Sequence, residues 1–168
     1  TAGEVSKYYA KDNRIKLIVR EKKGGRGSAI LRGLKEGLKN KNMEFFVEMD
    51  ADLCHDPKYI PIMIKKCIIH DVVIASKYLK GSEIKGLNIK RKIFSRIANF
   101  YIRFILQVPI TDFTNGFRCY KRSALEKINF SSFYSKGFIV LSEIIYKIYK
   151  NGGSLKEIPF NFVHEEIN

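Results

Sequence analysis

Residues 44–56 read Glu-Phe-Phe-Val-Glu-Met-Asp-Ala-Asp-Leu-Cys-His-Asp, and they are the most informative stretch of the chain. A short apolar run bounded by polar residues is typical of a strand covered on both faces, as in a parallel sheet. Asp50 and Asp52 follow where the run stops. Ligands of open α/β sheets bind beyond the carboxyl ends of the strands. The two carboxylates are therefore placed to hold Mg²⁺ or Mn²⁺ on substrate phosphates, although a solvated acidic loop is the plain alternative.

The segments around this strand alternate between strand and helix patterns. Asp56-Pro57 has the N-cap and first-position proline of a helix start, and Asp71–Ser76 is a second buried strand. The order strand–helix–strand–helix–strand predicts an α/β fold with a mostly parallel sheet and right-handed crossovers. The expected strands are 14–19, 44–49, 71–76, a short one within 112–121 and a last one at 154–163. The expected helices are 3–11, about 28–39, 57–70, 89–107, 122–128 and 137–151, with a loop at 77–88.

Length and composition favour one globular domain. The chain has 168 residues, of which 45% are hydrophobic, enough for a sizeable core. No apolar run reaches the roughly 20 residues needed to cross a bilayer. Three widely spaced cysteines, Cys54, Cys67 and Cys119, predict free thiols in a reducing compartment, not a disulfide frame or a zinc site.

The net charge of +14 is compatible with nucleic acid, an anionic membrane or phosphorylated substrates. A sequence rich in Lys, Ile and Asn together can also acquire this charge from composition alone. The first residues read as helix and the chain starts with Thr1. We therefore expect a piece of a longer protein.

Two segments carry groups suited to anions. In Lys22–Ala29, bases and glycines precede a helix, where free N–H groups and the helix dipole favour an anion, but an ordinary turn fits equally well. On the helix at 89–107, Arg91, Ser95 and Asn99 share one face and could grip a phosphate or form a solvated stripe. The rest of that helix is largely apolar and aromatic, so it is expected to be core or interfacial.

The loop Thr111–Arg118 is dense in hydrogen-bonding groups. It could present Asp112 to a sugar and Arg118 to a phosphate. A turn held by its own Asx and Thr hydrogen bonds is the structural alternative.

Taken in order, these segments resemble the polyprenyl-phosphate sugar transferases of glycosyltransferase family 2, typified by dolichol-phosphate mannosyltransferase. The resemblance rests on six motifs and covers nearly the whole chain. They are Lys-Gly-x-x-Gly-x-Ala, Met-Asp-Ala-Asp-Leu-x-His-x-Pro, Asp-Val-Val-Ile-Ala-Ser-Lys-Tyr, Arg-Lys-x-x-Ser-x-x-Ala-Asn, Asp-x-Thr-x-Gly-Phe-Arg-x-Tyr and Ser-Lys-Gly-Phe followed by a Glu. It implies the Rossmann-like GT-A fold of nucleotide-diphospho-sugar transferases, with residues 1–168 as a single catalytic domain.

The resemblance also implies an activity. A hexose, with mannose favoured, passes with inversion from a nucleotide diphosphate sugar, with GDP-mannose favoured, to a polyprenyl or dolichyl phosphate. Mg²⁺ or Mn²⁺ assists, the enzyme is peripheral on the cytoplasmic face of a membrane surface, and nucleic acid is not a partner. The implied site residues are Asp50 and Asp52 for the metal; Asp52 and Asp112 for catalysis; Arg20, Lys23, Gly24, Gly27, Asp50, Ala51 and Asp52 for the nucleotide sugar; and Lys77, Arg91, Ser95 and Arg118 for the acceptor phosphate.

Departures from the family pattern qualify these expectations. The family's first strand with its aspartate-rich loop, and a basic segment beyond the last strand, have no counterpart, so the domain is expected to lack its first βα unit and its C-terminal tail. Lys77 replaces an Arg, Cys54 replaces an oxygen-bearing side chain, and Val140-Leu141 replace the Phe-Gln of the mannosyl branch. Transfer of glucose or an aminosugar to undecaprenyl phosphate, or a related glycan synthase, stays open. The non-enzyme alternatives are an inactive GT-A scaffold and a domain that binds anionic surfaces.

Overall fold

The computed structural model describes residues 2–9, 11–12, 14–21, 24–135 and 137–163. A four-stranded sheet forms its centre, in the order β1-β4-β2-β5. β4 pairs antiparallel with both β1 and β2, and β2 pairs parallel with β5, so β1, β2 and β5 run in one direction. The sheet is thus mixed: three strands are parallel as predicted, and one opposes them. The strands are β1 (Phe45–Glu48), β2 (Val72–Ser76), β4 (Arg118–Lys121) and β5 (Leu155–Pro159).

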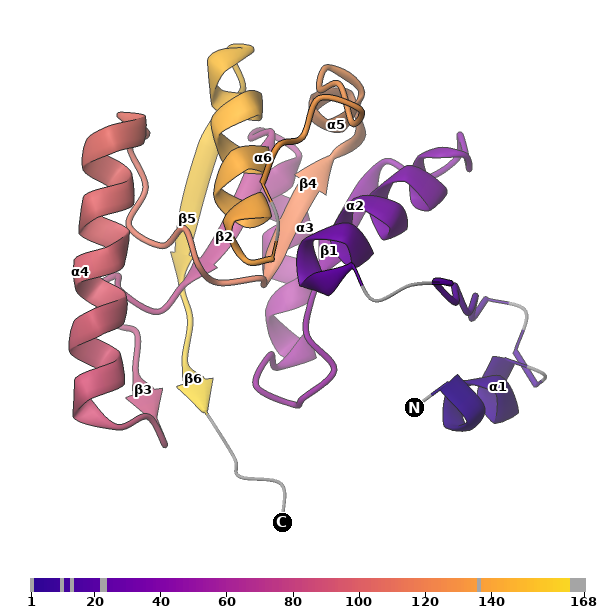
Figure 1. The fold of residues 1–168 in the computed structure, drawn as a ribbon, viewed down its shortest axis with the longest axis horizontal. Coiled ribbons are helices and arrows are strands. Elements are labelled where there is room, and N and C mark those ends of the chain that lie inside the picture. Colours follow the sequence, from indigo (N-terminus) through magenta and orange to yellow (C-terminus); the bar gives the residue numbers. More distant parts are fainter. Residues whose placement is uncertain (1, 10, 13, 22–23, 136, 164–168) are drawn as a thin grey trace.

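Helices cover both faces of the sheet (Figure 1). One face carries α2 (Gly25–Leu38), α5 (Arg122–Glu126) and α6 (Ile139–Lys150). The other carries the short 3₁₀ helix η1 (Pro57–Tyr59) and α3 (Ile60–Cys67). Because successive strand residues point to opposite faces, β2 sends Val72 and Ile74 into the first core and Val73 and Ala75 into the second. This explains why the sequence of β2 is apolar without interruption.

β1 forms as predicted, but it lies at the edge of the described sheet and is not buried on both faces as the sequence predicted. Among the described residues it pairs with β4 alone, and only Phe46 of its four residues is fully buried. The predicted strand at 14–19 is absent, and these residues run as coil between α1 (Ala2–Tyr9) and α2. A strand needs a neighbour for its N–H and C=O groups. Residues 14–19 have none in the described chain, where Lys16 instead pairs with Glu36 of α2 at 2.6 Å.

The last predicted strand is two strands. β5 leaves the sheet after Pro159, and β6 (Phe162–Val163) pairs parallel with β3 (Ile84–Lys85), which lies inside the predicted loop 77–88. At the break, Phe160 N donates to Ser82 Oγ at 3.1 Å. The chain after β5 thereby leaves its pairing with β2 and continues as β6 beside β3.

The long helix α4 (Ile89–Leu106) stands at one end of the molecule (Figure 1). The Asn88 side chain caps it by accepting from Lys90 N at 2.9 Å. Asp56 caps η1 in the same way, as its sequence predicted, through Lys58 N. In the described part of the chain, no helix combines the length and the apolar character that crossing a membrane requires. The three cysteines are buried, and none forms a disulfide with another, as the sequence predicted.

Candidate active site

The turn that follows β1 is built around His55. The imidazole is buried and stacks on Phe117, with ring centroids 4.9 Å apart. Its Nδ1 accepts from Asp50 N at 2.8 Å, and its Nε2 lies 3.0 Å from Asn115 Oδ1. Burial lowers the pKa of His55, so the ring is neutral and Nε2–H donates to Asn115. His55 therefore fixes the backbone of the aspartate turn.

Asp52 is held by a local turn. Its Oδ1 accepts from Cys54 N at 3.1 Å, while Leu53 adopts the left-handed conformation with φ 64°. A non-glycine residue with positive φ is uncommon and marks a tightly determined turn. The Asp52 carboxylate is thus fixed close behind Asp50, with Ala51 exposed between them.

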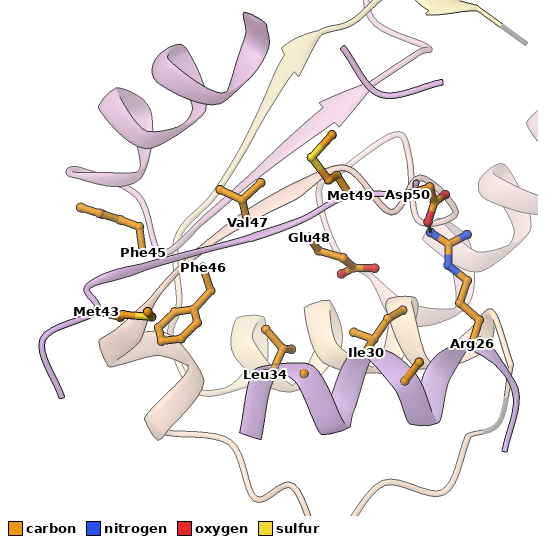
Figure 2. Close-up of a pocket in the computed structure, with 12 residues that line it drawn as sticks. Arg26, Ile30, Leu34, Met43, Phe45, Phe46, Val47, Glu48, Met49 and Asp50 are labelled. Atoms are coloured by element: carbon orange, nitrogen blue, oxygen red, sulfur yellow. Dashed lines mark ion pairs between the residues drawn. The ribbon is translucent and has the colours of Figure 1, made fainter. Parts of the chain in front are cut away.

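Arg26 joins the first turn of α2 to the aspartates. Its Nη2 lies 2.6 Å from Asp50 Oδ1 (Figure 2). The guanidinium passes over Gly116, where a Cβ would overlap it. Arg26 was not among the site residues predicted from the sequence, although it lies inside the basic glycine turn Lys22–Ala29. A cation therefore already sits on Asp50.

A pocket of about 550 Å³ lies between α2 and β1 (Figure 2). Phe46 and Glu48 point from β1 towards α2, and Arg26 with Asp50 closes the charged end. Glu48 Oε2 accepts from Tyr120 Oη at 2.9 Å, whereas Oε1 is buried without a hydrogen bond. Burial raises the pKa of Glu48 to about 7. Of the predicted nucleotide-binding residues that the structure describes, only Asp50 lines this pocket.

The aspartate pair fits a hard divalent cation. Asp50 already neutralises the Arg26 guanidinium, and both side chains offer only oxygen donors, which Mg²⁺ and Mn²⁺ prefer. No group of three His, Cys, Asp or Glu side chains able to hold a metal occurs in the part of the chain that the structure describes. A cation at Asp50 and Asp52 would need further oxygens from a substrate diphosphate and water.

Asp112 lies at the same edge of the sheet and is completely buried. Lys77, directly after β2, places its Nζ 3.2 Å from Asp112 Oδ2. Asp112 Oδ1 also accepts from Thr114 N at 3.1 Å and Asn115 N at 3.0 Å. Asp112 N donates to Glu157 Oε1 at 2.9 Å, which anchors the loop on β5. The Asx turn that the sequence left open as the structural alternative is present, and it carries a buried ion pair.

The polar stripe of α4 faces this loop. Asn99 is buried, its Oδ1 accepts from Phe113 N at 2.6 Å, and its Nδ2 donates to Thr114 Oγ1 at 3.3 Å. One turn earlier, Ser95 Oγ accepts from Tyr78 Oη at 2.6 Å. Arg91 continues the stripe and is exposed. The structure thus brings Ser95 and Lys77 together through Tyr78, beside Asp112.

The structure does not support a phosphate-binding role for Arg118. The side chain is completely buried and donates to the backbone carbonyls of Asn115, Leu141 and Phe113 at 2.8, 2.6 and 2.7 Å. Arginine is well suited to this task because its guanidinium carries five donors in a fixed plane. Arg118 therefore ties the 111–117 loop to α6 and is not available to a ligand.

The predicted nucleotide turn is described only in part, because Lys23 lies outside the described residues. Arg20 is exposed, and its Nη1 donates to Gly25 O at 2.9 Å and to Ser28 Oγ. Gly24 is the N-cap of α2. A Cβ at Gly27 would overlap Val140 of α6, so this glycine is explained by close helix packing.

Asn115 links the aspartate turn after β1 with the end of β2, where Lys77 pairs with Asp112. Its side chain accepts from His55 below the aspartate turn and donates to Ala75 O of β2, two residues before Lys77. The sequence contained signals for part of this arrangement: Glu48 interrupts an apolar strand, and Asn115 lies in the loop that was singled out. Tyr78 ends one of the motifs of the family resemblance, but that motif did not indicate its hydrogen bond to Ser95.

Comparisons with known proteins bear on the family of this chain. Residues 1–129 match the family model described as Glycosyl transferase family 2. The chain is 35% identical over 159 residues to a polyprenol monophosphomannose synthase of Mycolicibacterium smegmatis, covering 94% of this chain and 60% of that protein. It is 30% identical over 158 residues to an undecaprenyl-phosphate mannosyltransferase of Micrococcus luteus, covering 94% and 65%. The chain thus spans less than two thirds of the length of these relatives.

Solved structures share the fold at low sequence identity. A mycobacterial protein superposes with a TM-score of 0.61 at 16% identity, covering 91% of this chain and 47% of that one. Glucosyl-3-phosphoglycerate synthase from Mycobacterium tuberculosis, in complex with Mn²⁺ and UDP-glucose, gives a TM-score of 0.57 at 16% identity, covering 90% and 49%. The fold is GT-A, as the sequence resemblance implied, and the chain belongs to glycosyl transferase family 2.

Proposed function

We propose that this chain forms part of an inverting glycosyltransferase that moves a hexose, with mannose favoured, from a nucleotide diphosphate sugar to a polyprenyl phosphate. One observation carries the proposal: the aspartate pair after β1 and the Lys77–Asp112 pair after β2 meet at one edge of the sheet, joined by Asn115. The names of the two curated relatives support a polyprenyl phosphate acceptor and mannose.

The donor diphosphate is proposed to bind at the aspartate turn. Asp50 and Asp52 would hold Mg²⁺ or Mn²⁺, which neutralises charge on the leaving diphosphate. Arg26 must release Asp50 for this and stays close enough to contact the diphosphate itself. Arg20, Gly24 and Ala51 lie on the two turns that Arg26 connects, and are proposed to contact the nucleotide, for which we favour GDP.

The acceptor is proposed to bind between β2 and α4. A phosphate monoester has a second pKa of about 6, so it is ionised near neutral pH and needs no general base. One of its oxygens attacks the anomeric carbon as the bond from that carbon to the diphosphate oxygen breaks, which inverts the centre. Arg91 and Ser95, one helical turn apart, and Lys77, whose ammonium has three donors, would hold the phosphate in line. Asp112 is completely buried in its ion pair with Lys77, so it would orient a sugar hydroxyl beside the reacting carbon only after Lys77 releases it.

The lipid acceptor places the reaction at a membrane. We propose that the enzyme works as a peripheral protein at the cytoplasmic face, where nucleotide sugars are available, and that nucleic acid is not a partner.

Transfer of labelled mannose from GDP-mannose into lipid-extractable product tests the function directly. Asp52→Ala should lower transfer by about a hundredfold or more while leaving the melting temperature near wild type, because it removes charge stabilisation at the leaving group. Asp56→Ala, which removes a cap four residues away, is the matched control and should keep most activity. Full transfer by Asp52→Ala, or by the wild type in excess chelator, would overturn the metal assignment. A preference for UDP-glucose would overturn mannose.

A further inference from the structure

Glu48 and Arg26 each have one buried polar atom that makes no hydrogen bond with the described residues. Glu48 Oε2 accepts from Tyr120 Oη at 2.9 Å, but Oε1 has no such partner. Arg26 Nη2 lies 2.6 Å from Asp50 Oδ1, yet its N–H groups are not directed at that oxygen and make no hydrogen bond there. A buried donor or acceptor that stays unpaired costs free energy, and native structures rarely contain one. This part of the molecule therefore holds one unused donor and one unused acceptor.

The two unused atoms lie close together beside Gly116. A Cβ on Gly116 would overlap Arg26 Nη2 and would lie 3.2 Å from Glu48 Oε1, so both atoms border the same point. Figure 2 shows the Glu48 carboxylate pointing from β1 towards the guanidinium, which comes from α2. Because glycine leaves this point open, the Arg26 side chain can turn from Asp50 to Glu48 by rotation alone.

Binding of a divalent cation at Asp50 would require such a turn. Arg26 and the cation would compete for the same carboxylate, and two positive groups on one carboxylate repel each other. Only 24% of the Arg26 side chain is exposed, so a guanidinium driven off Asp50 would be a poorly solvated charge unless it found another anion. Glu48 Oε1 offers that anion at the point where the guanidinium already lies.

We propose that Glu48 is a positioning residue for the metal site: when a divalent cation binds Asp50, Arg26 turns to Glu48 Oε1. The new pair satisfies both unused atoms, which offsets part of the cost of displacing Arg26 from Asp50. A guanidinium has five donors, so Arg26 held by Glu48 still has N–H groups to direct at a diphosphate. The proposal rests on the proposed function for the cation, and its test measures binding without sugar transfer.

A double-mutant cycle tests the exchange. The Kd of Mn²⁺ together with GDP, which supplies the diphosphate oxygens, is measured by titration calorimetry at pH 8. Glu48→Gln keeps the side-chain size and an acceptor for Tyr120 but removes the charge that Arg26 needs, so it should raise this Kd about fivefold to tenfold. When Arg26→Met is already present, adding Glu48→Gln should change the Kd by less than about twofold, because no guanidinium is left to receive.

The control and the contrary results are equally specific. Glu44→Gln is the matched control, because Glu44 is an exposed carboxylate directly before the same strand, and it should leave the Kd unchanged. Melting temperatures in EDTA separate loss of folding from loss of binding. A wild-type Kd for Glu48→Gln would overturn this proposal and leave the metal site intact. An equal loss in the Arg26→Met background would also overturn it, because Glu48 would then act on the cation directly. Failure of the wild type to bind Mn²⁺ with either GDP or UDP would overturn the proposed metal site as well.

Discussion

Gly116 is the residue on which the Arg26–Asp50 pair depends. A Cβ there would overlap the Arg26 guanidinium and lie 3.2 Å from Glu48 Oε1, so one of these buried groups must move. Gly116→Ala should destabilise the protein by up to about 1 kcal/mol, because the guanidinium is the far end of a flexible side chain and can move aside at the cost of its ion pair with Asp50. Gly33, in the middle of α2, has no atom within 4 Å of its Cβ position, and Gly33→Ala should stabilise by up to about 1 kcal/mol. Urea unfolding of both variants measures the contrast, and equal effects would contradict the placement of Arg26.

Glu48 makes stability depend on pH. Burial raises its pKa from 4.5 to about 7, so the unfolded chain loses this proton at lower pH than the folded one. The contribution of Glu48 to stability must therefore fall as pH rises from about 4.5 to about 7, by up to about 3 kcal/mol, and then level off. Glu48→Gln removes this cost. Its melting temperature, measured in EDTA so that no metal binds Asp50, should exceed the wild type by more at pH 8 than at pH 4.5. A constant difference would contradict the shift.

Arg91 tests the proposed acceptor site. If it binds the acceptor phosphate, Arg91→Ala should raise the KM for polyprenyl phosphate about tenfold or more and the KM for the sugar nucleotide much less. Lys90→Ala is the control, because Lys90 is an exposed neighbour that points to the outer side of α4. Equal changes in both KM values for Arg91→Ala would assign this end of α4 a structural role.

At the scale of the element, α4 ends at a strained residue. Gln107, its C-cap, is left-handed with φ 55°, although its Nε2 donates to Phe104 O at 2.6 Å. Gln107→Gly and Gln107→Ala both lose that bond, but only glycine adopts positive φ without steric cost. Gln107→Gly should therefore be more stable than Gln107→Ala by about 1 kcal/mol. Thermal melts compare the two, and equal stability would rule out strain at the helix end.

Elements whose partners are close in sequence were predictable. Capping by Asp56 and the helical period of α4 depend on residues within one or two turns. β2 could be predicted because all its residues are buried, which gives a continuous apolar run in the sequence. The segment 14–19 has the pattern of a strand, but pattern alone does not provide a hydrogen-bonding neighbour. The break between β5 and β6 depends on Ser82, which is 78 residues from its partner Phe160. Such distant contacts leave no local signal.

For the candidate site, the sequence located the aspartates and the 111–118 loop but not the role of each side chain. Asp50, Asp52 and Asp112 follow strand ends or lie in a polar loop, which local patterns reveal. Whether an arginine meets a ligand depends on burial, and Arg118 is buried whereas Arg91 is exposed. The pairing of Arg26 with Asp50 joins α2 to β1 and could be found only from their packing.

At the scale of the whole molecule, the antiparallel strand β4 sets the spacing between the two strands, β1 and β2, whose ends carry the proposed site. It separates β1 from β2, whose carboxyl ends therefore stand two strand spacings apart, about 10 Å. Because β4 runs the other way, it starts at that edge, and residues 111–117 fill the interval that it creates. The sheet thus fixes the distance between the aspartate turn and Lys77. Substitutions in residues 111–117 can change the shape of the space between these two points, while the backbone pairing of the strands keeps the distance constant.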